Sequence, residues 1–171
     1  MLGMEFRGYA RRKLADLHAQ IVRCAGLCSD VQLWHRANVH SNSIGNLLLH
    51  LRGNLMQWIA AGLDGRTFER DRPAEFAQRG PLPRGPMLDG LADAAHQADE
   101  VLARLTDEDL GRTFEIQGYR VSGLAAVFHV VEHFAFHTGQ IVVMTKALCD
   151  RDLSLYDEHG RRRDGRAESA P

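Results

Sequence analysis

Apolar residues recur at intervals of three and four positions in four separate stretches of the chain. These stretches cover about residues 6–30, 43–62, 87–105 and 122–148. Such spacing places the apolar side chains on one face of a helix, so each stretch predicts an amphipathic α-helix. In the second stretch the apolar stripe consists of Ile44, Leu47, Leu48, Leu51, Leu55, Trp58 and Ile59. We expect this stripe to face the core.

Polar segments separate the predicted helices. Ser41 or Asn42 can cap the second helix and Ser122 the fourth, because their side-chain oxygens accept the free amide protons of a first turn. Residues 64–85 are rich in proline and glycine, which predicts a long surface connection with room for a short helical turn around "PAEFA". The segment "RTFEIQGYRVS" fits either two very short strands around Gly118 or an irregular loop.

Four helical stretches without a convincing sheet predict an all-α fold, a four-helix bundle. The chain has 171 residues, of which 44% are hydrophobic, and this is enough for one core. We expect the bundle to span residues 1–156. Residues 157–171 lose the apolar periodicity and carry many charges, which predicts a disordered tail.

The charge balance argues against partners that bind by long-range attraction. Lys and Arg total 21 against 22 for Asp and Glu, so the formal net charge is -1. We therefore expect no nucleic-acid partner, and no membrane partner because no apolar run approaches the ~18 residues of a spanning helix. Cys24 and Cys28 lie on the apolar stripe of the first helix, where a packed core position is favoured over a redox site. We expect a cytoplasmic protein, since the chain begins without an export signal.

Three histidines, His129, His133 and His137, follow one another at steps of four in the last helix. They share one helix face, but the outer two lie ~12 Å apart along the axis, too far to hold one ion. An adjacent pair can chelate, and the spacing leaves both pairs open. A third ligand must come from another helix, and His50 beside the apolar stripe of the second helix is the leading candidate.

Histidines at such positions are also often hydrogen-bonded core residues. The motif is weaker than the HExxH motif of zinc peptidases, because no glutamate occupies the catalytic position. Glu132 is directed away from His133 and is better interpreted as a surface carboxylate than as a general base. Spacing alone therefore gives metal binding and a structural role comparable weight.

The sequence nevertheless resembles a known superfamily over about residues 5–156. The resemblance rests on "HSNSIGNLLLHLRGNLMQWI", "RDRPAEF" and "HVVEHFAFHTGQIVVMTKAL". These segments are similar to the DinB/YfiT-like superfamily, and specifically to a bacterial subfamily of unknown function with an HFxxHTGQI signature. The resemblance implies a four-helix bundle of DinB/YfiT type, commonly a homodimer.

The same resemblance implies a divalent metal ion, with zinc or nickel preferred, held by His50, His133 and His137. Gly139 and Gln140 complete the signature that follows the last histidine. The resemblance thus selects the pair of residues 133 and 137 over the pair of residues 129 and 133. His129, Gln140 and Asn54 are then candidates for supporting hydrogen bonds around the ligands.

Some relatives in this superfamily are thiol-dependent transferases that use bacillithiol or mycothiol. The resemblance therefore implies a metal-dependent enzyme, a transferase that acts with a low-molecular-weight thiol on a small-molecule substrate. The alternatives are a metal-dependent hydrolase and a non-enzymatic metal-binding dimer of a stress response. Arg66, Arg70 and Arg72 are candidates for binding an anionic group. The simpler interpretation is that they solvate the loop or pair with Asp71 and Glu75.

Overall fold

The computed structural model describes residues 1–161, and most of this part of the chain is helical. Two short strands are the only strands within it, and one turn has π-helical geometry. In chain order the elements are α1 (Leu2–Leu27), α2 (Asp30–Leu33), α3 (Ile44–Leu55), η1 (Met56–Ala61), α4 (Arg72–Ala77), α5 (Arg84–Arg104), α6 (Asp107–Gly111), β1 (Thr113–Ile116), β2 (Tyr119–Ser122) and α7 (Gly123–Cys149).

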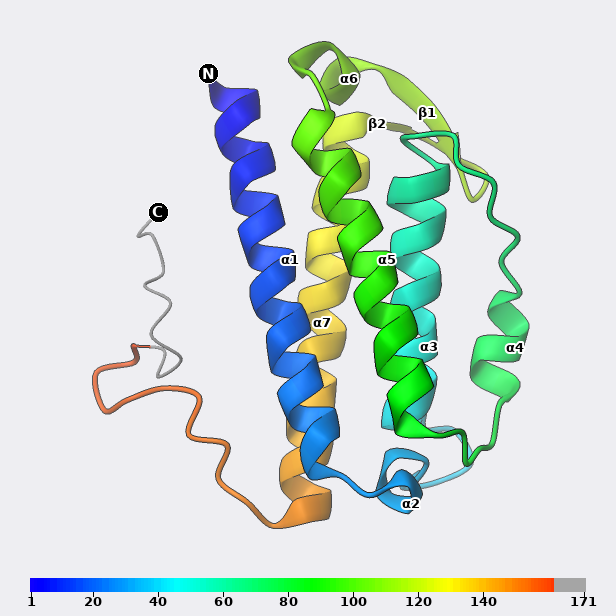
Figure 1. Ribbon diagram of the computed structural model, residues 1–171, viewed down its shortest axis with the longest axis vertical. Coiled ribbons are helices and arrows are strands. Elements are labelled where there is room, and N and C mark those ends of the chain that lie inside the picture. The colour runs from blue at the N-terminus through cyan, green and yellow to red at the C-terminus, as the bar shows by residue number, and fades with distance from the viewer. Residues whose placement is uncertain (162–171) are drawn as a thin grey trace.

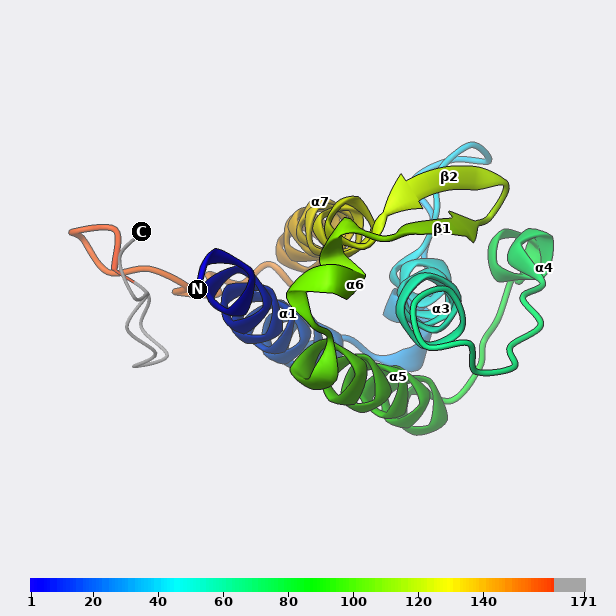
Figure 2. The same ribbon diagram turned by 90° about the horizontal axis from the view of Figure 1, so that it is seen from above.

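The long helices α1, α3, α5 and α7 lie side by side around one core (Figure 1). Seen from above, α1 is flanked by α5 and α7, and α3 is also in contact with both (Figure 2). The expected all-α class is confirmed. The largest side chains with almost no exposed surface include Ile21, Leu47, Leu51, Leu55, Ile59, Leu91, Leu102, Phe134 and Ile141.

The cap of the second long helix is one residue later than the sequence pattern suggested. Ser43, not Ser41 or Asn42, precedes α3, and its hydroxyl accepts a hydrogen bond from the Asn46 amide at 3.1 Å. The Asn46 side chain accepts the Ser43 amide proton in return at 3.1 Å. This reciprocal capping box satisfies two amides at once, so it prevails over a cap by either preceding residue.

The π-helical turn η1 continues α3 without a break, whereas the apolar pattern predicted an α-helix over the whole stretch. Its geometry is seen in the hydrogen bond from the Gly62 amide to the Gln57 carbonyl, five residues earlier, at 3.0 Å. A π-turn contains an extra residue, so it rotates the side chains relative to a regular helix. Trp58 lies within this turn.

Of the two alternatives for the segment before the last helix, the structure has the strands. β1 and β2 pair antiparallel, with Glu115 opposite Arg120. The turn needs positive φ at two residues, Gln117 at 54° and Gly118 at 81°, and glycine adopts such angles without steric cost. The hairpin lies beside the ends of α3 and α7, and α4 packs on the outer side of α3 (Figure 2).

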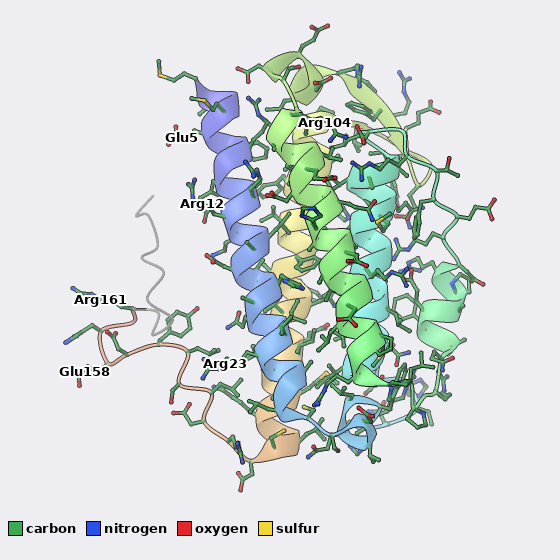
Figure 3. All side chains as sticks on the ribbon, viewed as in Figure 1. Glu5, Arg12, Arg23, Arg104, Glu158 and Arg161 are labelled. Atoms are coloured by element: carbon green, nitrogen blue, oxygen red, sulfur yellow. The ribbon has the colours of Figure 1, made fainter. Side chains whose placement is uncertain are left out.

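Charged side chains such as Arg12 and Glu5 point outward from α1 (Figure 3). Arg23 instead reaches the segment after α7 and donates a hydrogen bond to the Leu153 carbonyl at 2.6 Å. Cys24 and Cys28 are buried in the core, as their positions on the stripe predicted. No helix among the described residues is long and apolar enough to cross a membrane. Of the tail expected at 157–171, residues 162–171 lie outside the described part of the chain.

Candidate metal centre

Histidine side chains from α3 and α7 meet in the groove between these helices. One ring nitrogen from each of His50, His133 and His137 lies within 4.8 Å of the other two. The closest pair is His50 Nε2 and His133 Nε2, at 2.9 Å. His50 and His137 are buried and His133 is half-buried. The structure therefore brings together the three residues that the resemblance selected.

This arrangement fits a metal ion. Two imidazole nitrogens bound to one tetrahedral zinc lie about 3.3 Å apart, given Zn–N bonds of about 2.0–2.1 Å. The 2.9 Å between His50 Nε2 and His133 Nε2 is close to that spacing. Small rotations of the rings would bring all three nitrogens onto one ion, so this cluster could hold a divalent metal.

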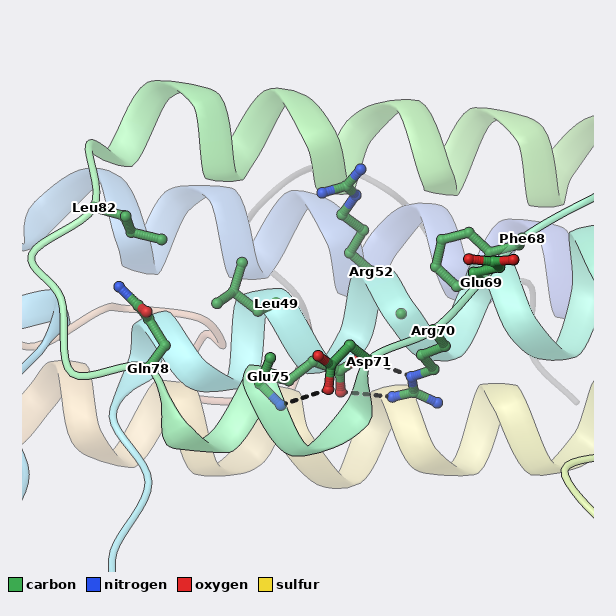
Figure 4. A pocket seen from close by; sticks show the side chains of 11 residues that line it. Leu49, Arg52, Phe68, Glu69, Arg70, Asp71, Glu75, Gln78 and Leu82 are labelled. Atoms are coloured by element: carbon green, nitrogen blue, oxygen red, sulfur yellow. Dashed lines mark hydrogen bonds and ion pairs between the residues drawn. The ribbon is translucent and has the colours of Figure 1, made fainter.

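The orientation of His50 is fixed by Glu75. His50 Nδ1 donates to Glu75 Oε2 at 2.9 Å, which leaves Nε2 facing the two histidines of α7. Arg70 binds the same carboxylate twice, through Nε at 2.7 Å and Nη2 at 2.8 Å (Figure 4). Burial acts to raise the pKa of Glu75, but the hydrogen bonds from His50 and Arg70 outweigh it and hold this pKa below its ordinary value. Glu75 is therefore an ionised carboxylate behind the ring.

His137 is oriented in a similar way from within its own helix. Its Nδ1 donates to Gln140 Oε1 at 2.7 Å, so Nε2 remains available to bind a metal ion. The two residues lie three positions apart and therefore face each other across one turn of α7. Gln140 thus makes a hydrogen bond to a candidate metal ligand. The resemblance proposed this supporting role for it.

Burial favours the neutral form of these rings. Burial lowers the pKa of His133 to about 3. Repulsion from His137, His50 and His129 when they are protonated, and from Arg70, acts in the same direction. The pKa of His137 is also lowered, mainly by burial. Neutral imidazole is the form that binds a metal ion, so the site is suited to ligation near neutral pH.

A hollow of about 360 Å³ opens beside the cluster. Its walls come from α3 and η1, from the connection before α4 and the first residue of α4, from the hairpin and from α7. The lining residues are His50, Asn54, Trp58, Arg70, Arg72, Gln117, Tyr119, Val121, Ala125, His129 and His133. We refer to it as the histidine hollow. Its volume is within the range of small-molecule sites.

His129 and Asn54 line this hollow without contacting the three histidines through a hydrogen bond in the described structure. The ring of His129 lies against that of Trp58, with centroids 4.2 Å apart, and 5.5 Å from the ring of His133. Asn54 is 2% exposed, and its Oδ1 has no hydrogen-bond partner among the described residues. Glu132 is exposed, as the sequence suggested.

The three arginines proposed for anion binding are in three different environments. Arg66 pairs with Asp64, two residues earlier in the chain, and with Glu100 of α5, and it does not line the hollow. Arg70 forms an ion pair with Glu75, so its role is to hold the carboxylate that orients His50. Arg72 lines the hollow and is exposed. The structure thus brings two of the three to the hollow.

Glu75 is the functional residue that sequence reasoning missed. The sequence presented it only as a partner of the loop arginines, and the structure adds its contact with His50. The helical turn α4 presents it, after Asp71 caps this turn by accepting the Ala74 amide proton at 3.0 Å. An aspartate cap followed by proline at the start of a turn is a local signal for α4. Nothing local indicated that the turn would pack on His50.

Two solved structures share the fold. A conserved protein from Enterococcus faecalis matches with a TM-score of 0.72 and 14% identity, over 84% of this chain and 97% of that chain. A DinB-like protein from Bacillus cereus ATCC 10987 matches with a TM-score of 0.59 and 17% identity, over 77% of this chain and 85% of that chain. At these identities the likeness establishes a common fold.

The sequence comparisons give the family. No curated protein matches the chain. The profile of the family described as "Protein of unknown function (DUF1572)" matches residues 2–156, which is most of the sequence. The chain therefore has a DinB-like fold and belongs to the DUF1572 family.

Proposed function

We propose that the protein is a metal-dependent enzyme that uses a low-molecular-weight thiol, of the bacillithiol or mycothiol type, to transfer a group to or from a small substrate. The observation that carries the proposal is the convergence of His50, His133 and His137 within 4.8 Å of one another, beside an open hollow. Three neutral imidazoles are typical of catalytic divalent sites, and zinc or nickel suits this ligand set.

The chain's own residues prepare the site for this ion. Glu75 and Gln140 hold the rings of His50 and His137 so that both Nε2 atoms face the centre of the cluster. Arg70 balances the charge of Glu75, so that a carboxylate can stay ionised behind the ring. A bound divalent ion would favour the deprotonated form of a thiol or water placed next to it.

The lining of the histidine hollow favours a thiol over water as the group to be activated. Metal-dependent hydrolases of the peptidase type use a carboxylate as general base, and none of the described residues lining this hollow is acidic. A thiol, with an ordinary pKa of about 8.5, needs much less help to ionise at neutral pH than water does. Hydrolysis remains the second candidate because the same ion would also activate water.

Metal content of the purified variants tests the metal site. We expect His50→Ala, His133→Ala and His137→Ala each to weaken zinc or nickel binding at least about a hundredfold, since two ligands remain. His129→Ala is the matched control, because His129 lies on the same face of α7 outside the cluster. Full metal occupancy in all three cluster variants would overturn the proposal.

Thermal shifts separate the candidate activities. We expect the metal-loaded protein to be stabilised by bacillithiol or mycothiol, and to lose this response in His133→Ala. Glutathione is the comparison thiol. A protein that binds metal at the cluster but responds to none of these thiols would favour the hydrolase or the non-enzymatic metal-binding protein.

A further inference from the structure

The histidine hollow has two arginines and no acidic residue in its described lining. Arg70 and Arg72 are among its eleven described lining residues, and none of the eleven is Asp or Glu. Glu75 does not line the hollow, but its ion pair with Arg70 neutralises the charge of that arginine. Arg72 makes no ion pair within residues 1–161, and its guanidinium group lies 5.0 Å from the centre of the Phe76 ring. The hollow is therefore suited to an anionic group beside Arg72.

A second hollow, on the other side of Arg70 and Glu75, has a different charge balance. It has a volume of about 380 Å³ and is drawn in Figure 4. Three acids, Glu69, Asp71 and Glu75, share its lining with two arginines, Arg52 and Arg70. No histidine of the cluster lines it. An anion is therefore favoured in the histidine hollow over this neighbour.

Aromatic rings form one wall of the histidine hollow. The rings of Trp58 and Tyr119 have centroids 6.4 Å apart and planes inclined by 28°. Trp58 Nε1 donates to Gln117 Oε1 at 3.1 Å, which ties the π-turn to the hairpin. Val121 and Ala125 continue this apolar side of the lining. Such a wall favours a flat, apolar ligand body.

Asn54 adds a polar position inside the same hollow. Its side chain is almost fully buried, and its Oδ1 has no donor within residues 1–161. Buried amide oxygens are rarely left without a partner, so a ligand O–H or N–H group is a natural donor here. Asn54 lies one helical turn after His50, which places this acceptor close to the cluster.

We propose that the histidine hollow binds a small aromatic carboxylate bearing a hydroxyl or amino group, as the substrate of the enzyme. The carboxylate pairs with Arg72, the ring lies along Trp58 and Tyr119, and the hydroxyl or amino group donates to Asn54 Oδ1. The inference rests on the proposed function for the statement that this ligand is the substrate. Binding of this ligand does not require the metal ion, because each contact named is with a side chain of the protein.

An NMR titration tests this binding with 3-hydroxybenzoate as the probe. The chain has two tryptophans, so its ¹⁵N spectrum has two indole signals, and Trp34→Phe assigns them. Trp34 does not line this hollow, and its Nε1 donates to the Leu82 carbonyl. We expect a saturable shift of the Trp58 signal with an unchanged Trp34 signal, in both the metal-free and the zinc-loaded protein.

Probe and protein variants identify the contacts. We expect 3-hydroxybenzamide, which lacks the charge, and the variant Arg72→Gln each to weaken binding about tenfold or more. Benzoate, which lacks the hydroxyl group, should bind several-fold more weakly than 3-hydroxybenzoate. Arg12→Gln is the matched control, because Arg12 is exposed on the outside of α1 (Figure 3). It should bind 3-hydroxybenzoate with unchanged affinity.

The outcomes separate this inference from the proposed metal site. Absence of a saturable Trp58 shift in both forms of the protein, or equal affinity in Arg72→Gln and the parent protein, would overturn the inference while leaving metal binding intact. A different outcome is that 3-hydroxybenzoate binds in a charge-dependent way while the three histidine variants bind metal as well as the parent protein. This result would support the ligand class and contradict the proposed function.

Discussion

Glu75 acts on the candidate metal centre through His50. Its carboxylate accepts a hydrogen bond from His50 Nδ1 at 2.9 Å and so favours the tautomer of His50 with an unprotonated Nε2. We expect Glu75→Gln, which keeps the shape but removes the charge, to raise the zinc dissociation constant about 10- to 100-fold. Competition with a chromophoric chelator measures this. Glu69→Gln is the control, as an exposed neighbour in the same connection, and equal affinities in the two variants would show that Glu75 does not act on the ligand.

The buried histidines predict a stability that depends on pH in the metal-free protein. Burial, followed by repulsion from the neighbouring histidines when they are protonated and from Arg70, lowers the pKa of His133 to about 3, whereas an unfolded histidine titrates near 6.5. Between these values the unfolded state binds more protons. The stability contribution is therefore complete above about pH 6.5 and is lost progressively as the pH falls towards about 3.

Urea unfolding at pH 7.5 and pH 5 measures this effect. We expect a lower free energy of unfolding at pH 5, and a smaller loss in His133→Asn than in the parent protein. His96→Asn is the control, because the His96 side chain is 76% exposed on α5. A loss of the same size in His133→Asn and in the control would contradict the role of His133.

Individual site residues were predictable where they lie on a regular helix. His50 was proposed from its place beside the apolar stripe, and the spacing of the α7 histidines left two pairs open. The family resemblance selected His133 and His137 and added Gln140. Glu75 could not be placed, since it reaches His50 from a connection whose path through space leaves no periodic pattern. For the same reason the sequence did not distinguish Arg66, which forms ion pairs, from Arg72, which forms none within residues 1–161.

Among the elements, α3 and the connection after it are joined by the buried side chain of Asn46. Besides capping α3 with Ser43, it donates to the carbonyls of Glu75 at 2.8 Å and Gln78 at 3.0 Å. We expect Asn46→Ala to lower the free energy of unfolding by about 1–3 kcal/mol, because buried polar groups lose their partners. The same variant should weaken zinc binding, since α4 carries Glu75.

Urea unfolding and zinc titration of one protein preparation give both quantities. Asn42→Ala is the matched control, because the structure gives the cap of α3 to Ser43. It should change the free energy of unfolding by less than about 0.5 kcal/mol. If Asn46→Ala lost stability while its zinc affinity stayed at the control value, the position of α4 would not depend on the hydrogen bonds of Asn46.

The helices themselves were predictable because their apolar stripes pack into one core. The observed α5 and α7 begin and end within a few residues of the expected bounds, and Ser122 caps α7 as expected. The π-turn η1 was not predictable, because the spacing of the apolar stripe fits a regular α-helix of about 100° per residue over the whole stretch. Its effect is local, since it sets where Trp58 lies beside the hairpin.

At the scale of the whole molecule, the outer face of α7 carries several large exposed apolar side chains, with the exposed charges of Glu132 and Lys146 among them. Its exposed residues Leu124, Phe128, Phe136 and Val143 fall within about 120° of the helix circumference. Exposed apolar patches of this kind often mark protein interfaces. Since the resemblance implies a homodimer, we propose that two copies associate through this face.

Sedimentation equilibrium tests the association. We expect the parent protein to be a dimer, and Phe128→Glu combined with Phe136→Glu to be a folded monomer, because two buried charges would oppose the contact. Tyr9→Glu on α1 is the control, as its aromatic side chain is 48% exposed on a different helix. A double variant that remains a dimer would exclude this face.

The central claim is that His50, His133 and His137 share one ion. Anomalous diffraction at the zinc edge from crystals of the zinc-loaded protein tests it most directly. We expect one strong peak about 2.0–2.1 Å from a ring nitrogen of each of the three histidines. A map with zinc elsewhere on the protein and no peak between these rings would contradict it.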